Sequence, residues 1–374
     1  SQCIRAMLFL ALQSAPQNGK RPVLLAARNA HKALLYAAAL LDFDIRWLWP
    51  SAQAEGALCS CPVTAEALTG ALHALAQQGI EPFGVYVTSP DYLGWVQDIP
   101  ALAAVCRAQG VSLLVDNAHG AYLRFLPQNC HPIAQGAAMC CDSAHKTLPV
   151  VTGGAYLHLA HDAPAQDEAA VRGALALFGS TSPSYLILQS LDACNAVLAG
   201  DYPRRLAQCC AALEGLRRSL NKAAAVRQCP VPLAVAGTQQ EPMKLTLDAA
   251  ALGCTGTALA ESLRRAQMEC EYADPRYVVL MFTTENPPQD YTRLQAALEQ
   301  LLAAVPAGLP RPENRAGEFA ALQQQAVQRC TIRQAVLGAQ VRVPVYKALG
   351  RVCAMPTVSC PPAIPVAVSG EEIT

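Results

Sequence analysis

The sequence lacks an excess of charge of either sign, because 28 lysine and arginine residues balance 28 aspartate and glutamate residues. General nucleic-acid binders normally have a basic excess, so this balance argues against that class. No stretch approaches the roughly 18 uninterrupted apolar residues of a membrane span. The apolar start, residues 1–12, lacks the basic segment and cleavage site of a secretory signal and fits an amphipathic helix better. We therefore expect a cytoplasmic protein that binds neither nucleic acid nor membranes.

The chain also lacks the cysteine spacing of a metal site or a disulfide framework, although it contains 16 cysteines. They are scattered, with adjacent pairs at 140–141 and 209–210, and no paired C-x-x-C of zinc-finger spacing occurs. Several lie in apolar runs, where cysteine behaves as a small hydrophobic residue. The sequence therefore predicts buried, reduced thiols and no metal site.

Short apolar runs alternate with helical patterns over roughly the first 160 residues. The runs that we expect to be strands lie at residues 22–26, 45–48, 84–88, 111–115 and 137–141. This alternation is typical of βαβ units and a mainly parallel sheet. Between residues 240 and 303 a strand, helix, strand, helix pattern suits a smaller α/β unit. We predict an α/β fold, with a large three-layer domain over residues 1–200 and a small domain with a proline-rich tail over residues 201–374.

Three polar residues, Thr88, Asp116 and Lys146, each follow one of the expected strands. Ligands of parallel sheets bind at the carboxyl ends of strands, so these residues are predicted to face one crevice. A lysine that can form a Schiff base and an aspartate that can pair with a pyridinium nitrogen are the groups that pyridoxal phosphate (PLP) needs most. The alternatives are a surface lysine after a strand and a turn or helix-capping aspartate.

Three motifs resemble those of the Orn/Lys/Arg decarboxylase family of fold-type-I PLP enzymes: Asp116-Asn-Ala-His-Gly120, Ser143-Ala-His-Lys-Thr-Leu-Pro149 and Gly153-Gly-Ala-Tyr-Leu-His158. Further landmarks follow the same order, at residues 27–32, 88–92, 180–185 and 361–365, so the resemblance spans nearly the whole chain. It implies an aspartate-aminotransferase-like fold. The chain departs from the family by starting at Ser1, inside the phosphate-binding turn, and by Pro-Pro-Ala-Ile-Pro in its tail. We expect that the N-terminal part of the large domain is missing.

The resemblance implies roles around the PLP ring. Lys146 would carry the cofactor, and Asp116 would keep the pyridine nitrogen protonated. His31 would stack on one face of the ring, and Ala118 would underlie the other. His119 would line the substrate cavity or simply pack.

The phosphate group would be bound by donors from three segments. Helix N-termini favour anions, which gives this role to the start of the first helix. The remaining donors come from two places. One is the pair of residues that flank the lysine, and the other is a loop that in this fold reaches the phosphate of a neighbouring subunit. These residues are Ser1 and Gln2, Ser143 and His145, and Thr181 and Ser182; the last two have helix capping as an equal alternative.

The resemblance also implies a reaction, the decarboxylation of arginine, lysine or ornithine to the corresponding amine, as in polyamine biosynthesis. Lys146 or His145 would return a proton to Cα, and Glu271 would accept the distal cation of the substrate or be an ordinary charge at a strand start. The fold implies a homodimer or a larger homo-oligomer. Two alternatives stay open: a PLP-dependent aminotransferase or lyase, and a non-catalytic paralogue that regulates an active subunit.

Overall fold

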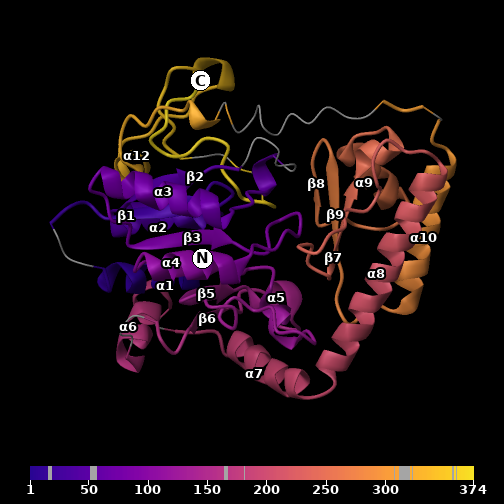
Figure 1. Cartoon of the computed structure of the whole chain (residues 1–374), viewed down its shortest axis with the longest axis horizontal. Helices are drawn as coiled ribbons and strands as arrows, with labels where there is room; N and C mark the ends of the chain where they lie inside the picture. The colour runs from indigo at the N-terminus through magenta and orange to yellow at the C-terminus, as the bar shows by residue number, and fades with distance from the viewer. Residues whose placement is uncertain are drawn as a thin grey trace.

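The computed structural model describes the chain except residues 16–18, 51–56, 164–166, 181, 307, 311–320, 322, 356, 357 and 359 (Figure 1). Its larger sheet has six strands in the order β2-β1-β3-β4-β5-β6. They are β1 (Val23–Ala27), β2 (Asp44–Leu48), β3 (Gly84–Thr88), β4 (Leu113–Asp116), β5 (Met139–Asp142) and β6 (Tyr156–Leu159). The first five are parallel and only β6 runs antiparallel to its neighbour β5, which confirms the predicted mainly parallel sheet.

Helices cover both faces of this sheet. Leu24 and Leu114 pack in one apolar cluster with α1 (Gln2–Gln13) and α2 (Ala33–Leu41). Val85 and Val115 pack in a second cluster with α3 (Ala65–Gln77) and α4 (Ile99–Ala108). Strands buried on both faces read as continuous apolar runs, which is why these strands can be found from sequence. The remaining elements of this part are α5 (Ala144–Thr147), α6 (Glu168–Phe178) and the short 3-10 helices η1 (Ala57–Cys59) and η2 (Ala121–Phe125).

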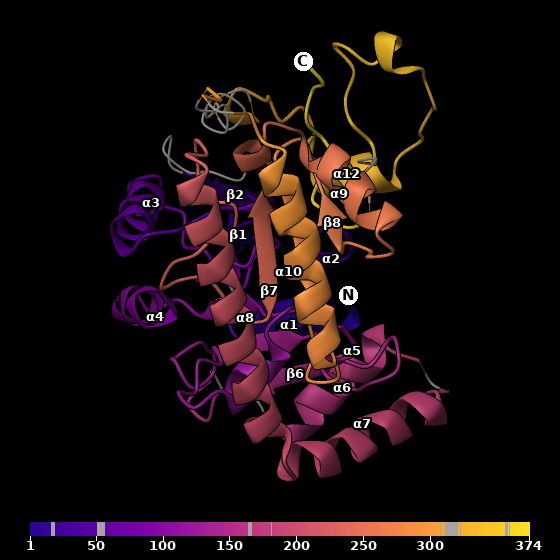
Figure 2. The same ribbon diagram turned by 90° about the vertical axis from the view of Figure 1, so that its right-hand side faces the viewer.

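A second, antiparallel sheet lies apart from the first and is joined to it by α7 (Tyr185–Ala199), which crosses the bottom of Figure 1. Its strands, in the order β7-β9-β8, are β7 (Lys244–Asp248), β8 (Tyr272–Ala273) and β9 (Tyr277–Met281). The helices of this part are α8 (Tyr202–Val226), η3 (Ala249–Leu252), α9 (Gly256–Arg265) and α10 (Pro288–Ala303). Figure 2 shows α8 and α10 side by side, and leucines at helical spacing on both helices form their shared core: Leu206, Leu213, Leu220, Leu294, Leu298 and Leu302.

The C-terminal tail packs against the large sheet. Helix α12 (Ile332–Leu337) contacts α2, and the short η4 (Val345–Lys347) follows it. The buried Arg28 guanidinium donates hydrogen bonds to the carbonyl oxygens of Pro365 at 2.8 Å and Val366 at 2.7 Å. The boundary between the two domains stays a prediction, but these contacts attach the tail to the large one. Among the described residues, no helix is both long and apolar enough to cross a membrane.

Two side chains of the small sheet donate hydrogen bonds to the turn that follows β3. The buried Lys244 Nζ donates to the carbonyl oxygen of Asp91 at 2.7 Å, and Thr246 Oγ1 donates to that of Leu93 at 2.8 Å. Both bonds satisfy buried polar groups that would otherwise be costly. They fix the position of Tyr92, which lies between the two bonded carbonyls in the chain.

Candidate active site

A cavity of about 230 Å³ lies at the carboxyl ends of β3, β4 and β5. Strand pairing places Thr88 beside Asp116, and Asp116 beside Cys141, so residues far apart in the sequence meet at one edge of the sheet. The structure brings nine of the residues named from the sequence to the lining of this cavity: Ser1, His31, Thr88, Asp116, Ala118, His119, Ser143, His145 and Lys146.

Lys146 lies in the single helical turn α5, four residues after the end of β5. Burial lowers the pKa of its amine, because a low-dielectric surrounding disfavours the ammonium form, although the carboxylates of Asp116 and Glu271 oppose this shift. Its Nζ lies 3.1 Å from Nε2 of His119. Burial, with the nearby Lys244 and Lys146, lowers the pKa of His119 well below its usual value. A neutral imidazole therefore stands within hydrogen-bond distance of the lysine nitrogen.

Asp116 is the last residue of β4 and only 2% exposed. Its Oδ2 accepts a hydrogen bond from the Tyr86 hydroxyl at 2.9 Å. Its Oδ1 is buried and has no hydrogen-bond partner within the part of the chain that the structure describes. A buried carboxylate oxygen without a donor is costly, so this atom is suited to an N–H from a ligand. The protonated pyridine nitrogen of PLP is such a donor, and the residues present therefore fit the cofactor.

His31 comes from the turn before α2, and Ala118 follows β4 by two residues. The Nδ1 atom of His31 accepts a hydrogen bond from the backbone N–H of Ala33 at 3.0 Å, which orients the ring. Burial lowers the pKa of His31, with Asp116 opposing the shift. Both residues line the cavity, but their roles on opposite faces of a PLP ring stay predictions.

The predicted phosphate contacts divide into two groups. Ser1, at the start of α1, lines the cavity together with Ser143 and His145, and His145 Nδ1–H donates to the carbonyl oxygen of Gly154 at 2.8 Å. Gln2 and Ser182 are exposed and do not line it. Thr181 lies outside the described residues. The structure thus gathers three of the six proposed phosphate donors around one cavity.

Tyr92 lines the cavity and is hydrogen-bonded to Glu271. The Tyr92 ring lines the cavity and meets the His119 ring edge-on, with 5.0 Å between the centroids. Its hydroxyl donates a hydrogen bond to Glu271 Oε1 at 2.5 Å. Glu271 itself is exposed and absent from the lining. Tyr92 belongs to the landmark segment 88–92 but has no role predicted from the sequence; its position just after the end of β3 is the signal that could have identified it.

The tail supplies lining residues that have no role predicted from the sequence. Pro362 and Ile364 line the cavity, and the backbone N–H of Lys32 donates to the carbonyl oxygen of Ala363 at 2.9 Å. The segment 361–365 is a landmark of the family resemblance, but it lies more than 300 residues from Lys32 in the sequence, so the sequence does not predict this contact.

The chain shares sequence with decarboxylases along most of its length. The family model described as "Orn/Lys/Arg decarboxylase, major domain" matches residues 10–288. The Bacillus subtilis protein YaaO is 28% identical over 360 residues, which cover 94% of this chain and 71% of YaaO. The Bacillus subtilis arginine decarboxylase is 26% identical over 354 residues, 93% of this chain and 70% of that enzyme.

The fold is shared with solved structures at lower identity. The Escherichia coli constitutive lysine decarboxylase superposes with a TM-score of 0.72 at 18% identity, covering 100% of this chain but 63% of that one. The likeness supports the predicted PLP-dependent transferase fold, while the chain spans less than two thirds of that structure's length. Because the family model matches well over half of its residues, the chain belongs to the Orn/Lys/Arg decarboxylase family.

Proposed function

We propose that this protein uses PLP to decarboxylate a basic amino acid, releasing the corresponding amine and CO₂. The observation that carries this proposal is the buried, unpartnered Oδ1 of Asp116 in the same cavity as the Lys146 amine. Membership of the family and the likeness to arginine and lysine decarboxylases support the reaction type.

When bound, PLP supplies an electron sink for the electron pair left as the bond between Cα and the carboxylate breaks. Lys146 would hold its aldehyde carbon, and Asp116 would stabilise the positive charge on its ring nitrogen. His31 and Ala118 would contact the ring. Ser1, Ser143 and His145 would bind the phosphate, the three donors that already line the cavity.

The proton that returns to Cα is best supplied by Lys146. Burial lowers the pKa of its amine, which makes the ammonium form a better proton donor than an exposed lysine would be. The neutral His119 ring, 3.1 Å from Nζ, keeps that proton and lone pair oriented in the cavity. His145 would have to act through Nε2, because its Nδ1–H donates to the Gly154 carbonyl oxygen.

Glu271 and Tyr92 are suited to bind the distal cation of the substrate. A carboxylate with a short hydrogen bond from Tyr92 is held at the edge of the cavity, where it can attract an ammonium or guanidinium group. Arginine, lysine and ornithine all carry such a group, so the site favours the class without choosing a member.

We also propose a homodimer. Beside Ser182, helix α7 exposes three large apolar side chains, Tyr185 at 84%, Leu186 at 72% and Leu188 at 47%. A cluster of this kind on a surface is typical of an interface. A second copy covering these side chains would place the neighbouring Ser182 at the subunit interface, as its proposed phosphate role would require. Cytoplasmic location and a role in polyamine biosynthesis stay predictions.

The function is tested by supplying PLP and offering arginine, lysine and ornithine separately. We expect equal amounts of CO₂ and amine from at least one of them, measured by mass spectrometry. A keto acid in place of the amine would contradict the proposal and favour an aminotransferase. A purified protein that binds no PLP would favour the non-catalytic alternative.

Replacing Glu271 tests the substrate site within the same assay. Glu271→Gln removes the charge that binds the distal cation, and a charged hydrogen bond contributes about 1.5–3 kcal/mol, so we expect KM to rise about 10- to 100-fold with little change in kcat. Glu269→Gln is the matched control, because Glu269 is exposed and pairs with Arg264 instead. Equal kinetics for the two variants would remove Glu271 from the substrate site.

A further inference from the structure

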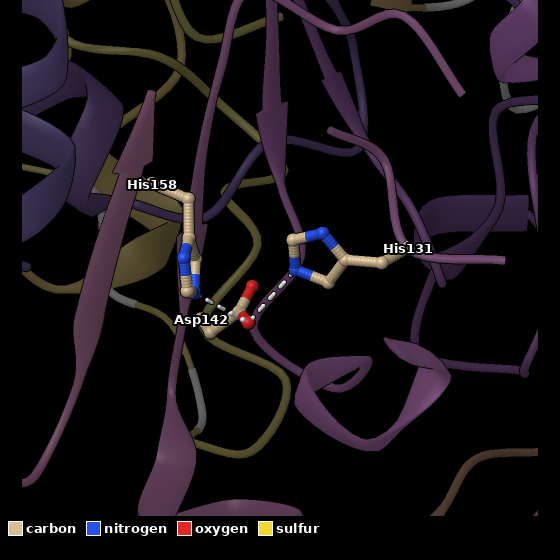
Figure 3. A group of neighbouring side chains, drawn as sticks. All are labelled: His131, Asp142 and His158. Atoms are coloured by element: carbon tan, nitrogen blue, oxygen red, sulfur yellow. Dashed lines mark hydrogen bonds and ion pairs between the residues drawn. The ribbon is translucent and has the colours of Figure 1, made fainter. Parts of the chain in front are cut away.

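Three side chains converge beside the active site on the end of β5. Figure 3 shows His131 and His158 pointing at the carboxylate of Asp142. The Nε2 atom of each histidine lies 3.1 Å from Asp142 Oδ2, and the three ligand atoms all lie within 4.8 Å of one another. His131 precedes β5, Asp142 ends it and His158 lies on β6, so the cluster joins three separate segments.

We propose that His131, Asp142 and His158 bind a Zn²⁺ ion. Imidazole nitrogen and carboxylate oxygen are common zinc ligands, and tetrahedral bonds of about 2.0–2.1 Å place such atoms about 3.3 Å apart. The two 3.1 Å separations are close to that value. Three protein ligands leave a fourth position for water or for another side chain.

The surroundings of the three ligands suit a bound cation. The second oxygen of Asp142, Oδ1, accepts a hydrogen bond from Asn117 Nδ2 at 2.7 Å, the kind of outer contact that orients a ligating carboxylate. Cys140 Sγ lies 3.7 Å from His131 Nε2 and 3.8 Å from Asp142 Oδ1, which makes it a candidate fourth ligand.

The cluster is enclosed on one side and open on the other. The side chains of His131 and Asp142 are 6% and 3% exposed, whereas that of His158 is 38% exposed. All three line a cavity of about 660 Å³ that also includes Tyr156, whose hydroxyl is buried without a partner among the described residues. An ion therefore has a route to the ligands.

The same distances also suit two neutral histidines that each donate Nε2–H to Asp142. Zinc would replace these two protons, and each ring would then carry its proton on Nδ1. The backbone N–H of Ile133 approaches His131 Nδ1 at 3.4 Å, beyond the usual hydrogen-bond range, so it opposes that change only weakly. A zinc site and a metal-free hydrogen-bonded cluster can be told apart by one measurement, the number of zinc ions bound per chain.

A zinc ion here would link β5 and β6 to the loop that precedes β5. Its ligand Asp142 lies just before α5, the helical turn that carries Lys146. The spacing of cysteine and histidine in the sequence predicts no metal site, because these ligands do not form a short motif. They are brought together by the pairing of β5 with β6. The inference does not depend on the proposed decarboxylase activity.

The test is zinc binding by the purified full chain, stripped with a chelator under reducing conditions. We expect one Zn²⁺ per chain by metal analysis, and visible d–d bands of a four-coordinate site with Co²⁺. His158→Ala and Asp142→Asn should each weaken zinc affinity by about 100-fold or more. His73→Ala is the matched control, because His73 is an exposed histidine on α3.

Two results would overturn the proposal. One is the absence of stoichiometric zinc in the wild-type chain. The other is equal zinc affinity in the wild type and in both variants, which would assign the ion to the cysteines elsewhere. Circular dichroism of His158→Ala and Asp142→Asn shows whether each is folded, and the more conservative Asp142→Asn decides the matter if His158→Ala is not. Because the readout is metal content, failure here leaves the decarboxylase proposal unaffected.

Discussion

Replacing Lys146 with alanine is expected to lower kcat/KM by about 10⁴-fold or more and to abolish the absorbance band of the lysine-linked cofactor. The change removes both the covalent attachment point and the amine that handles the proton at Cα. Among the described residues, Lys146 is the lysine that lines the cavity. Amine formation measured by mass spectrometry, with an absorbance spectrum, checks both parts of this expectation.

Lys222→Ala is the control for the loss of a lysine, because Lys222 is exposed on α8 and has no part in the site. It should retain wild-type turnover and spectrum. Turnover by Lys146→Ala at a level near that of Lys222→Ala would contradict the assignment of Lys146.

Asp116→Asn is expected to lower kcat by about 10³-fold, the size typical of losing one strong electrostatic contact to a developing charge. Asparagine has nearly the same shape, but it lacks the negative charge that would hold the pyridine nitrogen protonated. The prediction is checked by steady-state kinetics with saturating PLP.

Tyr86→Phe gives a graded comparison. It removes the 2.9 Å hydrogen bond to Oδ2 but leaves the carboxylate in place, so we expect a loss of only about tenfold. The order of the two variants is the informative result. If Asp116→Asn loses no more activity than Tyr86→Phe, the carboxylate does not act on the cofactor as proposed.

The parallel sheet could be predicted because its strands are buried on both faces and read as apolar runs. The expected strand at 84–88 has the observed bounds of β3. The antiparallel β6 was not predicted as a strand: its four residues are only half-buried, and they alternate aromatic, apolar and polar side chains. Its importance comes from pairing with β5, which brings His158 beside Cys140. A local pattern carries no information about such pairing.

The residues of the candidate site also fall into those that the sequence could predict and those that depend on distant contacts. Thr88, Asp116 and Lys146 could be placed together because each lies at or just beyond the end of a strand, and parallel strands end at one edge. Tyr92 could not be assigned, because its place depends on Lys244 and Thr246 from the small sheet. The proposed phosphate contact of Ser182 would require a second subunit, so it stays a prediction.

The most direct test of the account is to load the protein with PLP, reduce it with borohydride and locate the modified lysine by peptide mass spectrometry. Reduction fixes the cofactor to the nitrogen that held it. We predict one pyridoxyl group per chain, on Lys146. The buried Lys244 is an internal competitor, since its Nζ bonds to Asp91 within the same region. Modification of Lys244 or of surface lysines, with Lys146 unmodified, would contradict the central claim.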